Sequence, residues 1–97
     1  MVIIAATIDL DLPGVASLKE KRGILKSLIA RLHSAFNIAV AEVDLHDAWQ
    51  SAALGIAIVS TSAAHGEARL EQVLRWIEHN RPDVTIVDHE LEVIHFG

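Results

Sequence analysis

The sequence predicts an α+β domain in which strands and helices follow one another in the order βαββαβ. Four segments have the alternating or continuous apolar pattern of strands, and two have apolar residues at helical spacing. Each helical segment follows a hydroxyl residue suited to an N-cap, and Pro-Gly or Pro-Asp dipeptides punctuate the chain between elements. These observations together define the fold class.

The first strand and first helix have the clearest signals. Apolar residues alternate with other residues from Val2 to Leu12, which is the period of a strand with one buried face. After the Pro13-Gly14 turn, Ser17 offers an N-cap hydroxyl and Glu20 completes a capping box. A helix then extends to about residue 36. Its apolar stripe consists of Leu18, Leu25, Leu28, Ile29, Leu32, Ala35 and Phe36.

Two further strands are expected in the middle of the chain. Residues 37–43 predict the second strand, and residues 52–60 predict the third. The third is a nearly continuous apolar run, which is typical of a strand at the centre of a sheet. A polar connection separates the two strands, and we expect Trp49 at its end to cover the sheet edge rather than stack on a ligand.

The last helix and strand complete the pattern. Thr61 or Ser62 caps the second helix, which Pro82-Asp83 ends. Residues 84–95 predict the last strand, and a change of phase in its alternation indicates a bulge near Asp88-His89.

Right-handed crossovers and sequential pairing then favour a four-stranded antiparallel sheet with both helices on one face. This is the ferredoxin-like arrangement, with the first and third strands at the sheet centre. Residues 1–97 are expected to form this single domain.

Composition restricts the classes of function. With 52% hydrophobic and 22% charged residues, the chain is globular. It contains no cysteine, which excludes disulfides, thiolate catalysis and cysteine-ligated zinc. The start of the chain does not resemble a signal peptide, and the apolar runs are shorter than the roughly 20 residues of a membrane helix. We therefore expect a cytoplasmic protein without a membrane partner.

Charge is distributed unevenly along the chain. The formal net charge is -5, yet segment 17–34 holds five of the eight basic residues and one of the thirteen acidic residues. That segment therefore carries +4 and the remainder carries -9. Cations near a helix N-terminus oppose the macrodipole by about 0.3–1 kcal/mol each at low salt, and a bound anion would offset this cost.

The basic residues of the first helix are thus candidates for contact with a polyanion. Lys19, Arg22, Lys26 and His33 fall within about 60° of one another on a helical projection. The predicted polyanion-binding residues are Lys19, Lys21, Arg22, Lys26 and His33. The alternatives are solvated charges paired with nearby acids, a site for a small phosphate ligand, or a site for an acidic protein surface.

The open face of the sheet is a second candidate surface, because its expected residues are small and apolar. It has no aromatic residues on which RNA bases could stack. Its area of roughly 320 Å², from strand spacing, is near the largest patch on a typical monomer. This surface could instead join copies of the chain, with a small ligand between them. The predicted interface residues are Ile3, Ala5, Ala39, Ala41, Ala53, Gly55 and Ala57.

No pattern predicts catalysis, a metal or a cofactor. Two clusters could supply metal ligands and one pair of acidic residues could act as acid–base groups, but none has a diagnostic spacing or an accompanying motif. They are Asp44, His46 and Asp47, then Asp88, His89 and Glu90, and the pair Asp9 and Asp11. We expect no catalytic residue, no metal site and no cofactor.

Three stretches, SLKEKRGILKSLIARL, FNIAVAEV and DAWQSAALGIAIVS, closely resemble the YlxP-like family, a bacterial domain of unknown function. The resemblance covers nearly the whole chain and implies a ferredoxin-like fold with no assigned reaction. Gly23 departs from the family pattern, which often has a larger residue there. Glycine inside a helix costs about 1 kcal/mol against alanine.

Genes of this family often lie beside genes for translation initiation and ribosome maturation factors. The resemblance therefore implies a role linked to translation, close to RNA. We expect a non-catalytic accessory protein that contacts RNA or a ribonucleoprotein through its first helix. The alternative is a homo-oligomer associating through the sheet face.

Overall fold

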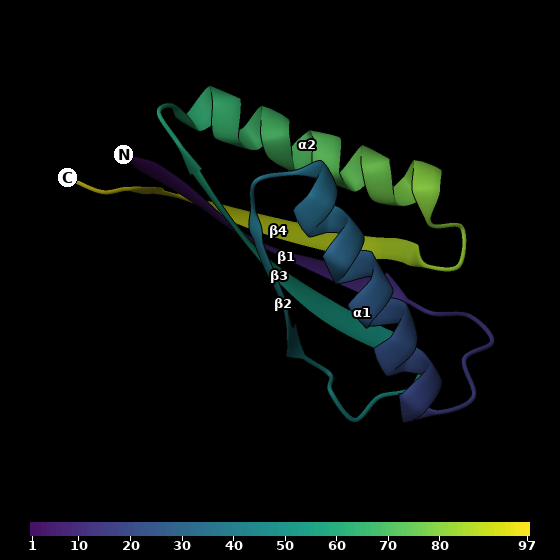
Figure 1. The fold of residues 1–97 in the computed structure, drawn as a ribbon. Helices are drawn as coiled ribbons and strands as arrows, with labels where there is room; N and C mark the ends of the chain where they lie inside the picture. Colours follow the sequence, from purple (N-terminus) through teal and green to yellow (C-terminus); the bar gives the residue numbers. More distant parts are fainter.

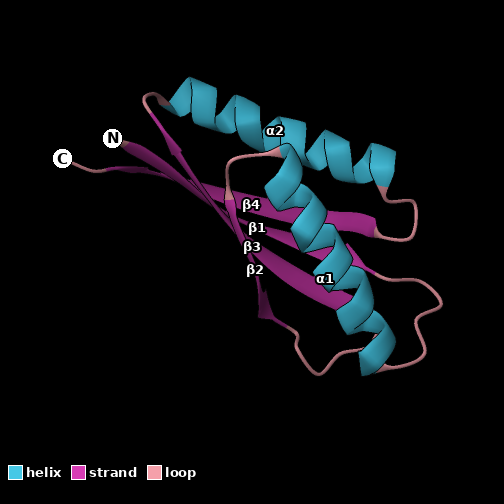
Figure 2. Cartoon of the chain, in the orientation of Figure 1, coloured by secondary structure: helices cyan, strands magenta, loops and turns pink.

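A computed structural model describes all 97 residues and has the predicted element order. Two helices lie on one face of a four-stranded sheet (Figures 1 and 2). The elements are β1 (Val2–Asp11), α1 (Leu18–Ala35), β2 (Ala39–Asp44), β3 (Ser51–Ser60), α2 (Ala63–Asn80) and β4 (Thr85–His95). The strand order is β2-β3-β1-β4 and every pairing is antiparallel, which confirms the ferredoxin-like arrangement.

Serine side chains fix the beginning of both helices. The Ser17 hydroxyl accepts a hydrogen bond from the Glu20 N–H at 3.1 Å, and Glu20 Oε2 accepts one from the Ala16 N–H at 3.1 Å. In α2, the Ser62 hydroxyl accepts from the His65 N–H at 3.2 Å. These bonds satisfy N–H groups that have no partner inside the helix. Neither helix has the length and apolarity needed to cross a membrane.

The alternation of the strands separates a core face from an open face. Even-numbered residues of β1 and β3 face the helices, and odd-numbered residues face away from them. The face of α1 and of β3 that the sequence assigns to the core is confirmed, because Leu25 of α1 is 3% exposed and Ile56 of β3 is 4% exposed. No element covers the other face of the sheet (Figure 1).

Two bulges adjust the edge strands. In β4 the register with β1 shifts at Val87, beside the predicted position. In β2 the register with β3 shifts at Val43, which the sequence pattern does not indicate. The second bulge has a steric consequence, because a Cβ on Gly55 would lie only 2.6 Å from Val43 Cγ1. Glycine at position 55 thus leaves room for the Val43 side chain.

Candidate functional site

Four of the five residues predicted to bind a polyanion lie exposed on one flank of α1. We call Lys19, Arg22, Lys26 and His33 the basic ridge. The structure contains three ion pairs, and no residue of the basic ridge takes part in any of them. In this structure the four side chains are therefore solvated and unpaired, and their binding of any anion stays a prediction.

The fifth predicted residue, Lys21, does not belong to this surface, and that part of the prediction is wrong. Lys21 is 1% exposed. Its Nζ donates hydrogen bonds to the carbonyls of Leu45 at 2.6 Å and Ala48 at 2.7 Å, and it lies 3.0 Å from Glu42 Oε2. That carboxylate oxygen is buried and has no other polar partner. The ammonium of Lys21 thus contacts three oxygen atoms within the protein, which leaves none of its three N–H groups for an external anion.

The apolar stripe of α1 carries the signal that could have placed Lys21. Lys21 precedes Leu25 by four residues, Leu28 by seven and Leu32 by eleven. These spacings put all four side chains on the buried face of the helix. The stripe therefore continues one turn toward the N-terminus with a lysine, whose ammonium reaches past the core to the loop after β2.

This contact fixes the connection between β2 and β3 against the start of α1. Gln50 adds two bonds, because its carbonyl accepts from the Leu12 N–H at 2.9 Å and its Nε2 donates to the Val15 carbonyl at 3.1 Å. Trp49 lies between these anchors, yet it is 54% exposed. That Trp49 covers the sheet edge stays a prediction.

The opposite flank of α1 serves the packing of the two helices. The Arg31 guanidinium lies 5.5 Å from the centre of the Trp76 ring, a cation–π contact between α1 and α2. Arg81 donates to both carboxylate oxygens of Asp83, at 2.9 and 2.7 Å, and to the Ser27 hydroxyl at 3.2 Å. The hydrogen bonds from Arg81 lower the pKa of Asp83 below its ordinary value of 3.8. These cations stabilise the fold and are separate from the basic ridge.

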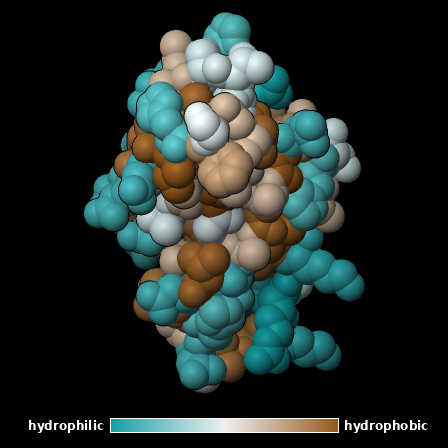
Figure 3. All heavy atoms as spheres, turned by 90° about the vertical axis from the view of Figure 1, so that its left-hand side faces the viewer, coloured by the Kyte–Doolittle hydropathy of each residue, from teal (hydrophilic) through white to brown (hydrophobic).

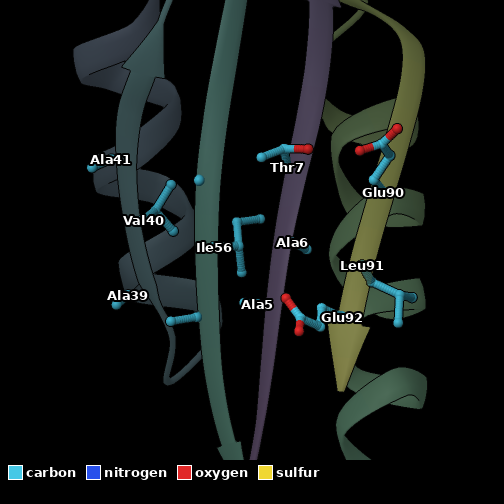
Figure 4. A pocket seen from close by; sticks show the side chains of 12 residues that line it. Ala5, Ala6, Thr7, Ala39, Val40, Ala41, Ile56, Glu90, Leu91 and Glu92 are labelled. Atoms are coloured by element: carbon cyan, nitrogen blue, oxygen red, sulfur yellow. The ribbon is translucent and has the colours of Figure 1, made fainter. Parts of the chain in front are cut away.

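The open face of the sheet contains a shallow hollow of about 550 Å³. Alanines of β1, β2 and β3 form its floor, and two glutamates of β4 border it (Figure 4). On the open face, the labelled residues of β1 and β2 are small (Ala5, Thr7, Ala39 and Ala41), while Glu90 and Glu92 of β4 lie beside Thr7 and Ala5. The hollow is thus apolar toward β2 and acidic toward β4.

The seven residues predicted as an interface share this open face. Pairing across the sheet aligns Ala39, Ala57 and Ala5 in one row, and Ala41, Gly55 and Thr7 in the next. Ala53 is only 6% exposed in the single chain, so it adds little surface for a partner. The predicted placement is confirmed, whereas association through this face stays a prediction.

Larger apolar side chains extend the exposed surface toward the chain termini, which lie side by side (Figure 1). Val59 and Ile94 flank Ile3 on the open face and are 69% and 37% exposed. Met1 and Phe96 are also exposed, and the Phe96 N–H donates to the Met1 carbonyl at 2.8 Å. Figure 3 shows apolar side chains reaching the surface between hydrophilic ones on the side of the molecule seen there.

Acidic residues continue along the β4 side of the open face. Asp9 lies directly opposite Asp88 in the β1–β4 register, an unfavourable arrangement of like charges. The structure has no group of three or more histidine or acidic side chains placed to hold a metal ion. The expectation of no metal site stays a prediction.

Comparisons with known proteins identify relatives of this sequence and fold. The chain is 42% identical to the uncharacterized protein YlxP of Bacillus subtilis (strain 168) over 62 residues, which is 64% of this chain and 67% of that protein. Its fold is similar to a crystal structure from Deinococcus radiodurans provisionally described as an antibiotic biosynthesis monooxygenase. The TM-score is 0.55 at 21% identity, covering 100% of this chain and 93% of the other. At that identity the likeness concerns the fold alone. Residues 3–91 match the family described as "Protein of unknown function (DUF503)", and the chain belongs to this family.

Proposed function

We propose that this protein is a non-catalytic, cytoplasmic accessory protein that binds RNA or a ribonucleoprotein through the basic ridge. The observation that supports this most strongly is the absence of any acidic partner for Lys19, Arg22 and Lys26, in a chain with thirteen acidic residues. Lys19 and Arg22 lie in the first turns of α1, where cations are unfavourable. A bound phosphate would offset this cost. We link the binding to translation because of the gene neighbourhood that the YlxP-like resemblance implies.

The distribution of charge is compatible with this proposal although the net charge is -5. Asp9, Asp88, Glu90 and Glu92 lie on the open face, on the side of the sheet away from α1. Charges separated by more than about 10 Å are largely screened at 0.1 M salt. A phosphate at the basic ridge would therefore respond mainly to the cations beside it.

Changing Lys19, Arg22 and Lys26 together to Gln should weaken RNA binding by about 100-fold. Each lost phosphate contact is worth on the order of 1 kcal/mol, and 1.4 kcal/mol corresponds to a tenfold change in Kd. A titration of fluorescently labelled ribosomal RNA fragments at 50 mM salt measures this change. Folding should persist, because all three side chains are exposed.

The matched control removes three exposed cations that do not belong to the basic ridge, with Arg31→Gln, Arg69→Gln and Arg75→Gln. It changes the net charge by the same amount and should weaken binding less than tenfold. Equal losses for the two triple variants would mean that overall charge, and not the basic ridge, governs binding.

The open face supports a second candidate, a homo-oligomer formed through the sheet. A stable interface buries about 800 Å² per partner, more than the small-residue patch alone supplies. The exposed Val59, Ile94, Met1 and Phe96 extend this patch. Face-to-face association would also enclose the hollow of about 550 Å³, whose size suits a small ligand between subunits.

Replacing Ala57 with Glu should convert such an oligomer into a monomer. Ala57 is exposed and lines the hollow, so a carboxylate there would be desolvated by a partner. Light scattering during gel filtration measures the mass, and Ala68→Glu, on the exposed side of α2, is the control that should leave it unchanged. A monomeric wild-type chain at high concentration would exclude this candidate.

A further inference from the structure

The most unusual exposed side chain is Trp49. The chain has two tryptophans, and the other, Trp76, is partly buried against the core and covered by Arg31. Trp49 instead leaves 54% of its surface in water. Aromatic side chains with one exposed face are common contact points at binding sites.

The backbone around Trp49 is held firmly despite this exposure. On one side, the Ala48 carbonyl accepts from Lys21 Nζ at 2.7 Å and the Ala48 N–H donates to the Leu45 carbonyl at 3.0 Å. On the other side, Gln50 bonds to Leu12 and Val15 at 2.9 and 3.1 Å. An aromatic ring on a fixed backbone loses little conformational entropy when a ligand stacks on it.

The same bonds determine what lies near the indole. Lys21 ties the loop to the first turns of α1, and Lys19 and Arg22 project from the same turns on the exposed side of the helix. The contact between Gln50 and Val15 brings the loop to the segment that leads into the helix cap. The buried lysine thus holds the loop that carries Trp49 against the helical turns from which the basic ridge begins.

We infer that Trp49 is a stacking platform for an unpaired base of a single-stranded RNA whose backbone phosphates contact Lys19 and Arg22. This inference rests on the proposed function and specifies the class of RNA. An aromatic face beside cations is the combination that single-stranded nucleic acids require, because every base has a π-face and every linkage carries a phosphate. In a duplex the bases are stacked on one another and present no free face.

Acidic residues also occur in this loop and at the start of α1. Glu20 and Asp44 are engaged locally, because their carboxylates accept from the N–H groups of Ala16 and Leu45. Asp47, two residues before Trp49 in the chain, takes part in none of the three ion pairs. A carboxylate in this loop opposes a phosphate there but tolerates an uncharged base, so the base belongs on Trp49 and the phosphates on the ridge.

Fluorescence provides the test. In a Trp76→Phe background, Trp49 is the single indole, and stacking of a base quenches indole emission. We expect ten-nucleotide oligo(A) and oligo(U) single strands to quench this emission on binding, and a ten-base-pair duplex of the two to bind more weakly without quenching it. Trp49→Ala should weaken single-strand binding by about tenfold, and Trp49→Phe should restore most of it.

The salt dependence separates a stacking contact from the phosphate contacts. Trp49→Ala should leave the log–log slope of binding against salt unchanged, whereas the triple Gln variant of the basic ridge should flatten it. If single strands bind through the ridge but Trp49→Ala binds as tightly as the wild type, the inference is overturned and the proposed function stands. If neither strand nor duplex binds, both are overturned. Equal quenching by a poly-glutamate peptide would also overturn it.

Discussion

Replacing Lys21 with alanine should lower the free energy of unfolding by about 3–5 kcal/mol, because it leaves a buried charge without a partner. The Lys21 ammonium supplies the one ion pair of Glu42 and donates to the carbonyls of Leu45 and Ala48. Without it, the buried carboxylate oxygen and both carbonyls must be satisfied by water or exposed by local unfolding. Chemical denaturation measures the loss.

Two controls distinguish this effect from loss of charge on α1. Lys26→Ala removes an exposed cation from the same helix and should change stability by less than about 0.5 kcal/mol. The double variant Lys21→Met with Glu42→Leu removes both charges together, and it should recover part of the loss. A cost below about 1 kcal/mol for Lys21→Ala would show that the buried pair does not hold the loop.

Leu28→Ala should cost about 2–5 kcal/mol of unfolding free energy, the range for removing a fully buried leucine side chain. Leu28 is 0% exposed and lies in the middle of the α1 stripe that covers the sheet. The cost combines the lost transfer of apolar atoms from water with the cavity that remains, because close-packed neighbours relax only partly.

Ser34→Ala is the matched substitution on the exposed side of α1, and it should alter stability by less than about 0.5 kcal/mol. Thermal or urea denaturation of the two variants under one set of conditions gives the comparison. Equal stabilities would mean that the face of α1 assigned to the core is wrong.

The sequence predicted the fold well because the strongest signals are local and periodic. The alternation from Val2 to Leu12 assigns every side chain of β1 to a face, and the serine caps fix where the helices begin. The phase change in the last strand placed a bulge close to its observed position. Patterns of this kind need no knowledge of distant contacts.

The candidate site was less predictable, since it depends on contacts between distant segments. Lys21 and Arg22 are adjacent and both basic, yet one is buried and the other exposed, and the difference arises from carbonyls more than twenty residues away. The same contacts hold Trp49 outward. The bulge at Val43 was missed because β2 is short and its exposed face carries little pattern.

The salt dependence of RNA binding by the wild-type chain tests the role of the basic ridge most directly. Each phosphate neutralised on a single strand adds about 0.7 to the magnitude of the slope of log affinity against log salt, so three contacts predict a slope of about -2. The measurement is a titration of a labelled single-stranded RNA at salt concentrations from about 50 to about 200 mM, a range over which such binding changes steeply. We expect measurable binding at the lower concentration and this slope. No binding at the lower concentration, or affinity that does not change with salt, would contradict RNA recognition by Lys19, Arg22 and Lys26.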